Sequence, residues 1–223
     1  MFDMNSPTVA RSWNARALLA ALALLPATSA IAGTDLDFDR TFNVDQEPPQ
    51  LHFKASYRVG GQDHAIEVWR DGDRRLRRRT DDAIETVVSR PANDSEWHMQ
   101  VFDLKRGTRT SIDRTNLIRI GHFVDWFGLS HGLARPVGAY VLTDARPPAK
   151  AVSPLSNCNW YALGESRICW SRALGVPMLI TDAQGEVQWR ITQANAKPLG
   201  DQAFAVAGQG FVHNDANADI QGD

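Results

Sequence analysis

The sequence predicts a mainly β protein of the α+β class, with an antiparallel meander forming a curved half-barrel sheet and an apolar helix packed on its concave face. Three observations predict this fold. Residues 51–112 alternate apolar and polar side chains in short runs separated by turn residues. Apolar residues then recur at helical spacing over 113–133, and short strand-like runs return after them. Successive strands with no helix between them exclude the βαβ alternation of a doubly wound nucleotide-binding fold.

The composition limits the class of protein. The chain has 223 residues, of which 43% are hydrophobic and 22% charged, so it can bury a core and is not a disordered tail. Its 24 basic and 26 acidic residues give a formal charge of −2. Without a basic excess, we expect no nucleic-acid partner.

The first 32 residues have the pattern of a secretory signal peptide. Two arginines precede the apolar run Ala17–Leu25, and Ala30-Ile31-Ala32 forms an A-x-A cleavage pattern. We therefore expect cleavage after Ala32 and a periplasmic product that does not span the membrane, because the apolar run is too short to cross a bilayer. The expected organisation is a signal peptide (1–32), an irregular leader (33–50), a single half-barrel domain (51–213) and a flexible tail (214–223).

The first hairpin is the clearest element. Residues 51–59 alternate without a fault, and Gly60-Gly61 supplies a two-residue turn in which positive φ carries no Cβ clash. The register that this turn sets pairs apolar residues with one another: Phe53 with Val68 and Ala55 with Ile66, with Val59 opposite Gln62. Further strands of the meander are expected at 74–79, 84–90, 97–101 and 108–112.

A helix is expected over 113–133, with Asp113 or Thr115 as its N-cap. Its apolar stripe contains Leu117, Ile120, Phe123, Val124, Trp126 and Phe127. A stripe this apolar must be covered, which favours packing on the concave face of the sheet.

Strands return at 139–143, 159–163, 167–172, 178–181, 186–193 and 203–206. A hairpin centred near Gly164 places Cys158, Trp160 and Cys169 on one face, and Tyr161, Leu163, Ile168 and Trp170 on the other. The two cysteines share a face, and an even pair in an exported chain predicts a disulfide. Both faces carry a tryptophan, so both need cover, or one of them lines an apolar cavity.

One catalytic motif occurs. Gly128-Leu129-Ser130-His131-Gly132 matches G-x-S-x-G, and an acid and a histidine follow it in the order of an α/β-hydrolase: Asp144, Asp182 or Asp201, then His213. The context argues against a nucleophile elbow, because a helix-like stretch precedes Ser130 and Pro136 closely follows it. A serine hydrolase stays an alternative, and we otherwise expect no catalytic residues.

The six histidines are dispersed, and the two cysteines lack zinc-ligand spacing. There is also no glycine loop that opens a helix and cradles phosphate. We therefore expect neither a metal site nor a cofactor.

Six arginines lie within residues 70–79. Strand parity sends Arg75, Arg77 and Arg79 to one face, and Arg74 and Arg78 to the face of Leu76. Two interpretations remain open: a solvated edge strand that discourages aggregation, or a rim that recognises an anion.

The segment Ile168-Cys169-Trp170-Ser171-Arg172-Ala173-Leu174-Gly175-Val176-Pro177-Met178-Leu179-Ile180, followed by Asp182, Gly185 and Trp189, carries a family resemblance. It resembles the periplasmic lipoprotein-carrier superfamily, which includes the lipoprotein localisation factors and related regulators of envelope-stress signalling. The resemblance implies an open half-barrel whose concave side, partly closed by helices, holds acyl chains or a partner segment without catalysis. The cysteine pair and the single expected helix depart from that pattern.

From these features we expect an exported binding protein for a lipid, an acyl chain or a lipoprotein. The expected cavity lining is Trp97, Met99, Leu117, Ile120, Phe123, Val124, Phe127 and Trp170, with Arg74 and Arg78 at the polar mouth. The alternative is an interaction or regulatory subunit that holds no ligand and docks on an envelope protein.

Overall fold

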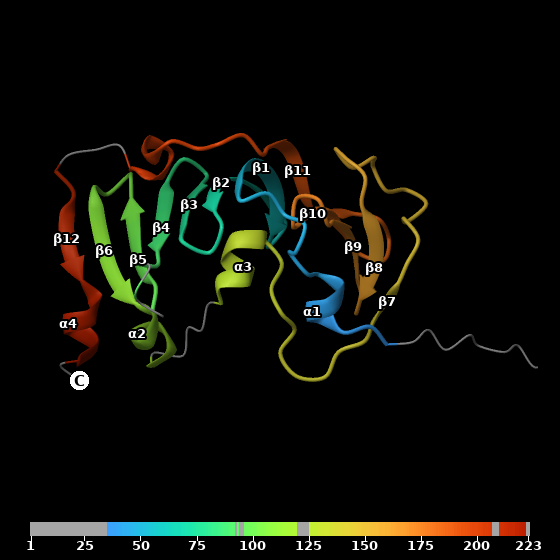
Figure 1. Ribbon diagram of the computed structural model, residues 1–223, viewed down its shortest axis with the longest axis horizontal. Helices are drawn as coiled ribbons and strands as arrows, with labels where there is room; N and C mark the ends of the chain where they lie inside the picture. The colour runs from blue at the N-terminus through green and yellow to red at the C-terminus, as the bar shows by residue number, and fades with distance from the viewer. Residues whose placement is uncertain (1–34, 92, 94–95, 120–124, 207–209, 222–223) are drawn as a thin grey trace, which may run out of the picture. The chain divides into compact units, whose positions relative to one another are not determined.

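The computed structural model describes residues 35–221 apart from residues 92, 94–95, 120–124 and 207–209, so the expected signal peptide lies outside the described residues. The described strands form one mixed sheet of twelve (Figure 1). The strands are β1 (Gln50–Val59), β2 (Gln62–Asp71), β3 (Arg75–Thr80), β4 (Ile84–Ser89), β5 (His98–Asp103), β6 (Thr108–Asp113), β7 (Leu142–Asp144), β8 (Asn159–Leu163), β9 (Ser166–Ser171), β10 (Val176–Thr181), β11 (Val187–Asn195) and β12 (Val212–Asp215).

The expected antiparallel meander is confirmed over β1–β6, where each strand pairs with the next along the chain. In the first hairpin Phe53 faces Val68, Ala55 faces Ile66 and Val59 faces Gln62, as the Gly60-Gly61 turn predicts. The two glycines have φ of 57° and 79°, a conformation that a side chain would strain. Turn chemistry and apolar alternation therefore suffice to set this register.

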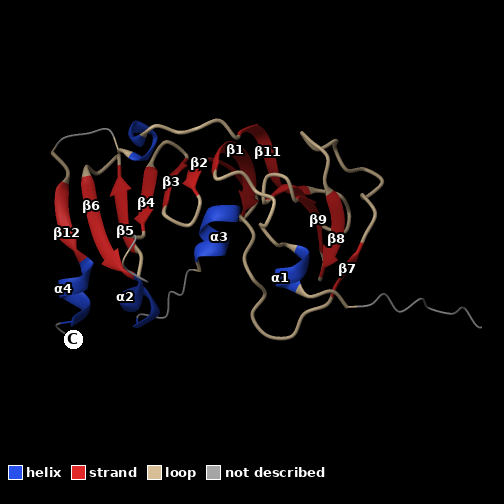
Figure 2. Cartoon of the chain, in the orientation of Figure 1, coloured by secondary structure: helices blue, strands red, loops and turns tan. Residues whose placement is uncertain are grey.

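The strand order brings the two halves of the chain together at β1. It runs β12-β6-β5-β4-β3-β2-β1-β11-β10-β9-β8-β7, so the second meander β7–β11 joins the first through the antiparallel β1–β11 pair. Strand β12 adds to β6 in parallel and makes the sheet mixed. Strands β7 and β12 end the order, and the sheet is not closed into a barrel (Figure 2).

The β8–β9 hairpin has the expected parity and the expected disulfide. Trp160 faces Cys169 across the hairpin, and Cys158 is bonded to Cys169 with 5.3 Å between their Cα atoms. The two faces contribute to different cores. Cys158, Trp160 and Cys169 belong to the large cluster around Phe53, Val68 and Met178, whereas Tyr161, Leu163, Ile168 and Trp170 belong to a smaller one.

Aromatic side chains of the segment 38–42 and of Phe127 cover the smaller cluster. Helix α1 (Phe38–Thr41) supplies Phe38, and Phe42 follows at its C-cap. The Phe42 ring lies 5.2 Å from that of Trp170, and Phe127 lies 6.1 Å from Trp170. Both faces of this hairpin are thus covered, as its two tryptophans require.

The helix expected over 113–133 is not one continuous element. Residues Arg114–Arg119 form α2 and residues Trp126–His131 form α3. Asp125 has an extended backbone and its side chain accepts a hydrogen bond from Gly128 N, so it is the N-cap of α3. Apolar spacing did not reveal this cap. Ile120, Phe123 and Val124, three expected lining residues, lie outside the described residues.

Three further expectations need correction. The segment 33–50 is not an irregular leader throughout, because it contains helix α1, in which Phe38 is buried, and Phe42 is buried next to that helix. The segment 214–223 is no mere tail, since β12 reaches into it and α4 (Ala216–Gln221) follows. Residues 201–204 form a short 3₁₀ helix, η1 (Asp201–Phe204), instead of contributing to a strand at 203–206.

Within the described part of the chain, no helix is long and apolar enough to cross a membrane.

Candidate functional site

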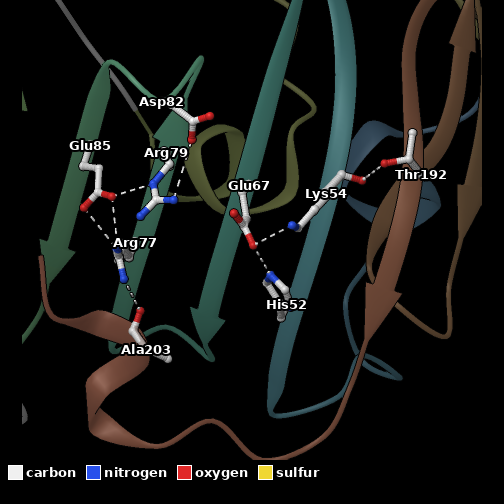
Figure 3. Close-up of polar contacts among 9 residues, drawn as sticks. All are labelled: His52, Lys54, Glu67, Arg77, Arg79, Asp82, Glu85, Thr192 and Ala203. Carbon is white, nitrogen blue, oxygen red and sulfur yellow. Dashed lines mark hydrogen bonds and ion pairs between the residues drawn. The ribbon is translucent and has the colours of Figure 1, made fainter. Parts of the chain in front are cut away.

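Charged side chains on one face of β1–β4 pair with one another (Figure 3). Glu85 accepts hydrogen bonds from Arg77 at 2.8 Å and from Arg79 at 2.6 Å. On the neighbouring strands, Glu67 lies 2.8 Å from His52 and 3.4 Å from Lys54. Burial alone would raise the pKa of Glu85, but the bonds from the two arginines outweigh it and hold the pKa below its ordinary value. We call this surface the polar face.

The arginine run is therefore largely neutralised. Strand β3 lies between β2 and β4, so the edge-strand interpretation is wrong. Arg75 bonds Asp71 and Asp201, and its guanidinium lies 4.2 Å from the centre of the Phe204 ring. Arg74 also bonds Asp71, and most of its side chain is exposed. Arg74 thus forms a local ion pair and is not among the residues that line the cavity described below.

A cavity of about 370 Å³ opens on the polar face, between β1, β2 and β3. Its lining includes cations and anions in contact: Lys54 with Glu67, and Arg79 with Asp82 at 3.6 Å. The charged groups of this lining already pair with one another, and the cavity is smaller than the one described below, so the polar face is the weaker candidate site.

On the opposite face, a buried polar network fixes α3 to the sheet. Arg70 has a fully buried side chain and lies 2.9 Å from Glu47, whose carboxylate is also 2.9 Å from His131 Nε2. Arg70 also donates to the carbonyls of Ser130 and Leu174. Burial lowers the pKa of Arg70, and the attraction of Glu47 opposes that shift.

Ser130 and His131 belong to this network. The Ser130 hydroxyl donates to the Trp126 carbonyl at 2.6 Å and lies 2.8 Å from His131 Nδ1. Burial lowers the pKa of His131, and Glu47 opposes the shift. Serine, histidine and carboxylate stand in triad order, but Ser130 has 0% of its surface exposed, so its hydroxyl does not face solvent in this structure.

The partners expected for a hydrolase are wrong. His213 lies on β12 and contacts Ser111 at 3.1 Å, while Ser130 contacts His131. The Gly128–Gly132 motif instead ends α3: Gly132 has φ of 71°, and its N–H bonds the Gly128 carbonyl. A Cβ at Gly132 would lie 2.9 Å from Trp189, which explains the glycine here without catalysis.

A larger cavity, of about 590 Å³, adjoins this network. Arg78 of β3 lines it from the sheet, Gly128 and Leu129 line it from α3, and the segment 134–137 completes it. Its lining is mainly apolar, and its volume lies within the roughly 300–1,000 Å³ that is usual for small-molecule sites. We call it the α3 cavity and take it as the candidate site.

Three charged side chains border the α3 cavity. Asp125 is engaged as the cap of α3 and lies 3.6 Å from Arg135, which also bonds Asp39 at 2.9 Å. Arg78 differs from both. Its side chain bonds the Tyr57 hydroxyl, and burial lowers its pKa, which Tyr57 opposes. Within the described part of the chain, no carboxylate forms an ion pair with Arg78.

The other expected lining residues that fall within the described part of the chain do not line this cavity. Trp97 and Met99 are buried in the large cluster, with Leu117 packed against it. Trp170 is fully buried in the smaller cluster, and Phe127 packs on it. These side chains form core contacts, so of the expected ligand residues that the structure describes, only Arg78 lines the cavity.

Sequence reasoning missed Glu47, Arg70, His131 and Arg135. One signal was present: Arg70 shares strand parity with Ile66 and Val68, so it falls on the apolar face. Glu47 carried no such signal, because it lies in an irregular segment and meets Arg70 only in the folded chain.

Of the described histidine, cysteine and acidic residues, no three or more are grouped so as to hold a metal ion. A search with protein-family models and a search of curated proteins each find no match for this chain.

Proposed function

We propose that this chain is an exported, non-enzymatic binding protein of the bacterial envelope that holds an apolar or amphipathic ligand against its sheet. The observation that carries the proposal is the α3 cavity, which is mainly apolar and about 590 Å³ in volume. A lining of this kind favours acyl or other apolar groups, because they leave water on binding.

Further support comes from two walls of the α3 cavity, one formed by α3 and the other by the segment 134–137. The fully buried Arg70 and its Glu47 partner hold α3 on the sheet, so one wall of the cavity is built on a fixed element. The segment 134–137 forms another wall, and Val137 is fully exposed at its end. A fixed wall beside an exposed apolar loop suits a site that ligands enter and leave.

Export is part of the proposal. The A-x-A pattern before Gly33 and the Cys158–Cys169 bond both fit an oxidising compartment outside the cytoplasm. Amino-terminal sequencing of the protein from a bacterial periplasmic extract tests it, and a mature chain that still began at Met1 would contradict it.

Native mass spectrometry of the purified protein tests the binding proposal directly. We expect the protein to carry a co-purified ligand, seen as added mass, that extraction with an apolar solvent removes. Adding an amphiphile to the extracted protein should restore a bound mass. A protein that carries no mass and takes up no amphiphile would favour the alternative, an envelope interaction subunit without ligand. Within the described residues, the pairing of Arg75, Arg77 and Arg79 weakens that alternative, since it leaves less free basic surface for an acidic partner.

A further inference from the structure

Among the described residues, one guanidinium of the arginine run, that of Arg78, forms no ion pair with a carboxylate where it lines the α3 cavity. Arg75, Arg77 and Arg79 bond carboxylates on the polar face, whereas strand alternation turns Arg78 to the apolar face beside Leu76. There it lines the α3 cavity, with the Tyr57 hydroxyl as a side-chain partner. A guanidinium carries five N–H donors, and one hydroxyl uses a small part of that capacity.

The charged residues that line the cavity are Arg78, Arg135 and Asp125, and their charges sum to +1. Arg135 pairs with Asp125 and with Asp39, which does not line the cavity, so counting Asp39 brings the sum to zero. The charge of Arg78 is left without an anionic partner among the described residues. Keeping a partly buried charge without a counter-ion costs free energy, which an anionic ligand would recover.

From this geometry we infer that Arg78 binds the headgroup of the ligand, and that the ligand is an amphiphile with an anionic head, either a carboxylate or a phosphate. The inference rests on the proposed function and names its ligand class. The apolar chain lies along Leu129 and the segment 134–137, and Arg78 binds the head. Planar guanidinium donors match both carboxylate and phosphate oxygens, so the two heads share this site.

A competition assay on the mature protein tests the inference. A neutral fluorescent apolar probe, N-phenyl-1-naphthylamine, fills the cavity, and four compounds of equal chain length displace it: dodecanoate, dodecyl phosphate, dodecanol and dodecyltrimethylammonium. We expect both anions to bind about 10- to 100-fold more tightly than dodecanol, as a hydrogen-bonded charge allows. The cationic compound should bind most weakly. Preference between the two anions identifies a fatty-acid or a phospholipid type of head.

Variants of Arg78 test whether this residue binds the headgroup of the ligand. Arg78→Gln should bring the anions down to the affinity of dodecanol while leaving dodecanol unchanged, and Arg78→Lys should keep part of the preference. Arg106→Gln is the matched control, because Arg106 lies in the β5–β6 turn with 82% of its side chain exposed. It should leave all four affinities unchanged. The comparison of the four compounds on the unmodified protein needs no variant to fold.

The outcomes separate the inference from the function on which it rests. If dodecanol matches the anions on the unmodified protein, the anionic headgroup site is overturned while the apolar cavity stands. If neither the probe nor any compound binds, the proposed function itself fails. If inorganic phosphate alone competes as well as dodecyl phosphate, the site is for a free anion and the amphiphile is overturned.

Discussion

Removing Glu47 tests the buried network most sharply. Glu47→Ala takes away the carboxylate beside Arg70, whose side chain has no exposed surface, and so leaves a buried charge unpaired. Breaking a buried pair in this way costs about 3–5 kcal/mol, and we take the lower end because the Glu47 side chain is 16% exposed. A loss of about 3 kcal/mol lowers the melting midpoint of a domain this size by roughly 6–12 °C.

Urea unfolding followed by tryptophan fluorescence, together with thermal melts, measures this loss on the mature protein. The matched control is Asp63→Ala, which breaks an exposed pair with Arg58 and should not shift the midpoint measurably. The double variant Glu47→Ala with Arg70→Met should recover part of the stability, because it removes both charges. A single variant that costs less than about 1 kcal/mol would refute the reasoning, as would a double variant less stable than the single one.

The remaining predictions concern a histidine, a disulfide and a glycine. Burial lowers the pKa of His131 in the folded state, so the unfolded chain binds more protons and the stability of the fold should fall as pH drops below about 6.5. In thermal melts between pH 8 and pH 5, the His131→Asn variant should lose less stability on acidification than the unmodified protein. Replacing Cys158 and Cys169 by serine should cost about 3 kcal/mol in urea unfolding, from the short loop that the bond closes, and an equal stability in the oxidised and serine forms would contradict this. Gly132→Ala should cost about 1–2 kcal/mol or more, because its φ of 71° disfavours a side chain and Trp189 crowds the Cβ; a neutral effect in thermal melts would show that the α3 terminus relaxes freely.

Local patterns predicted the elements that local chemistry determines. The β1–β2 register followed from the glycine turn and the alternation of Phe53 and Val68 with polar neighbours. The parity of Cys158 and Cys169 likewise followed from the hairpin near Gly164. In such hairpins the pairing partners lie close in sequence, so turn geometry alone fixes which side chains share a face.

Two kinds of element were not predicted. One depends on a local cap that apolar spacing does not detect, because the side chain of Asp125 caps a new helix within the expected helix 113–133. The other kind depends on distant partners. The short segment around Phe42 looked irregular because its apolar content is low, yet Trp170 and Tyr161 bury it. The candidate site shows the same difference between what local patterns predict and what long-range contacts decide. Parity placed Arg78 on the apolar face, whereas the walls formed by α3 and 134–137 exist only in the folded chain.

The β1–β11 seam has a consequence for how the chain is made. Lys54 on β1 and Thr192 on β11 are bonded across 138 residues of sequence, so one edge of β1 stays without its partner until nearly the whole chain has emerged. Contacts this distant slow folding, and an unpaired edge that displays Leu51 and Phe53 invites pairing between chains. A chain truncated before residue 187 should therefore aggregate during synthesis, even though the whole first meander is present.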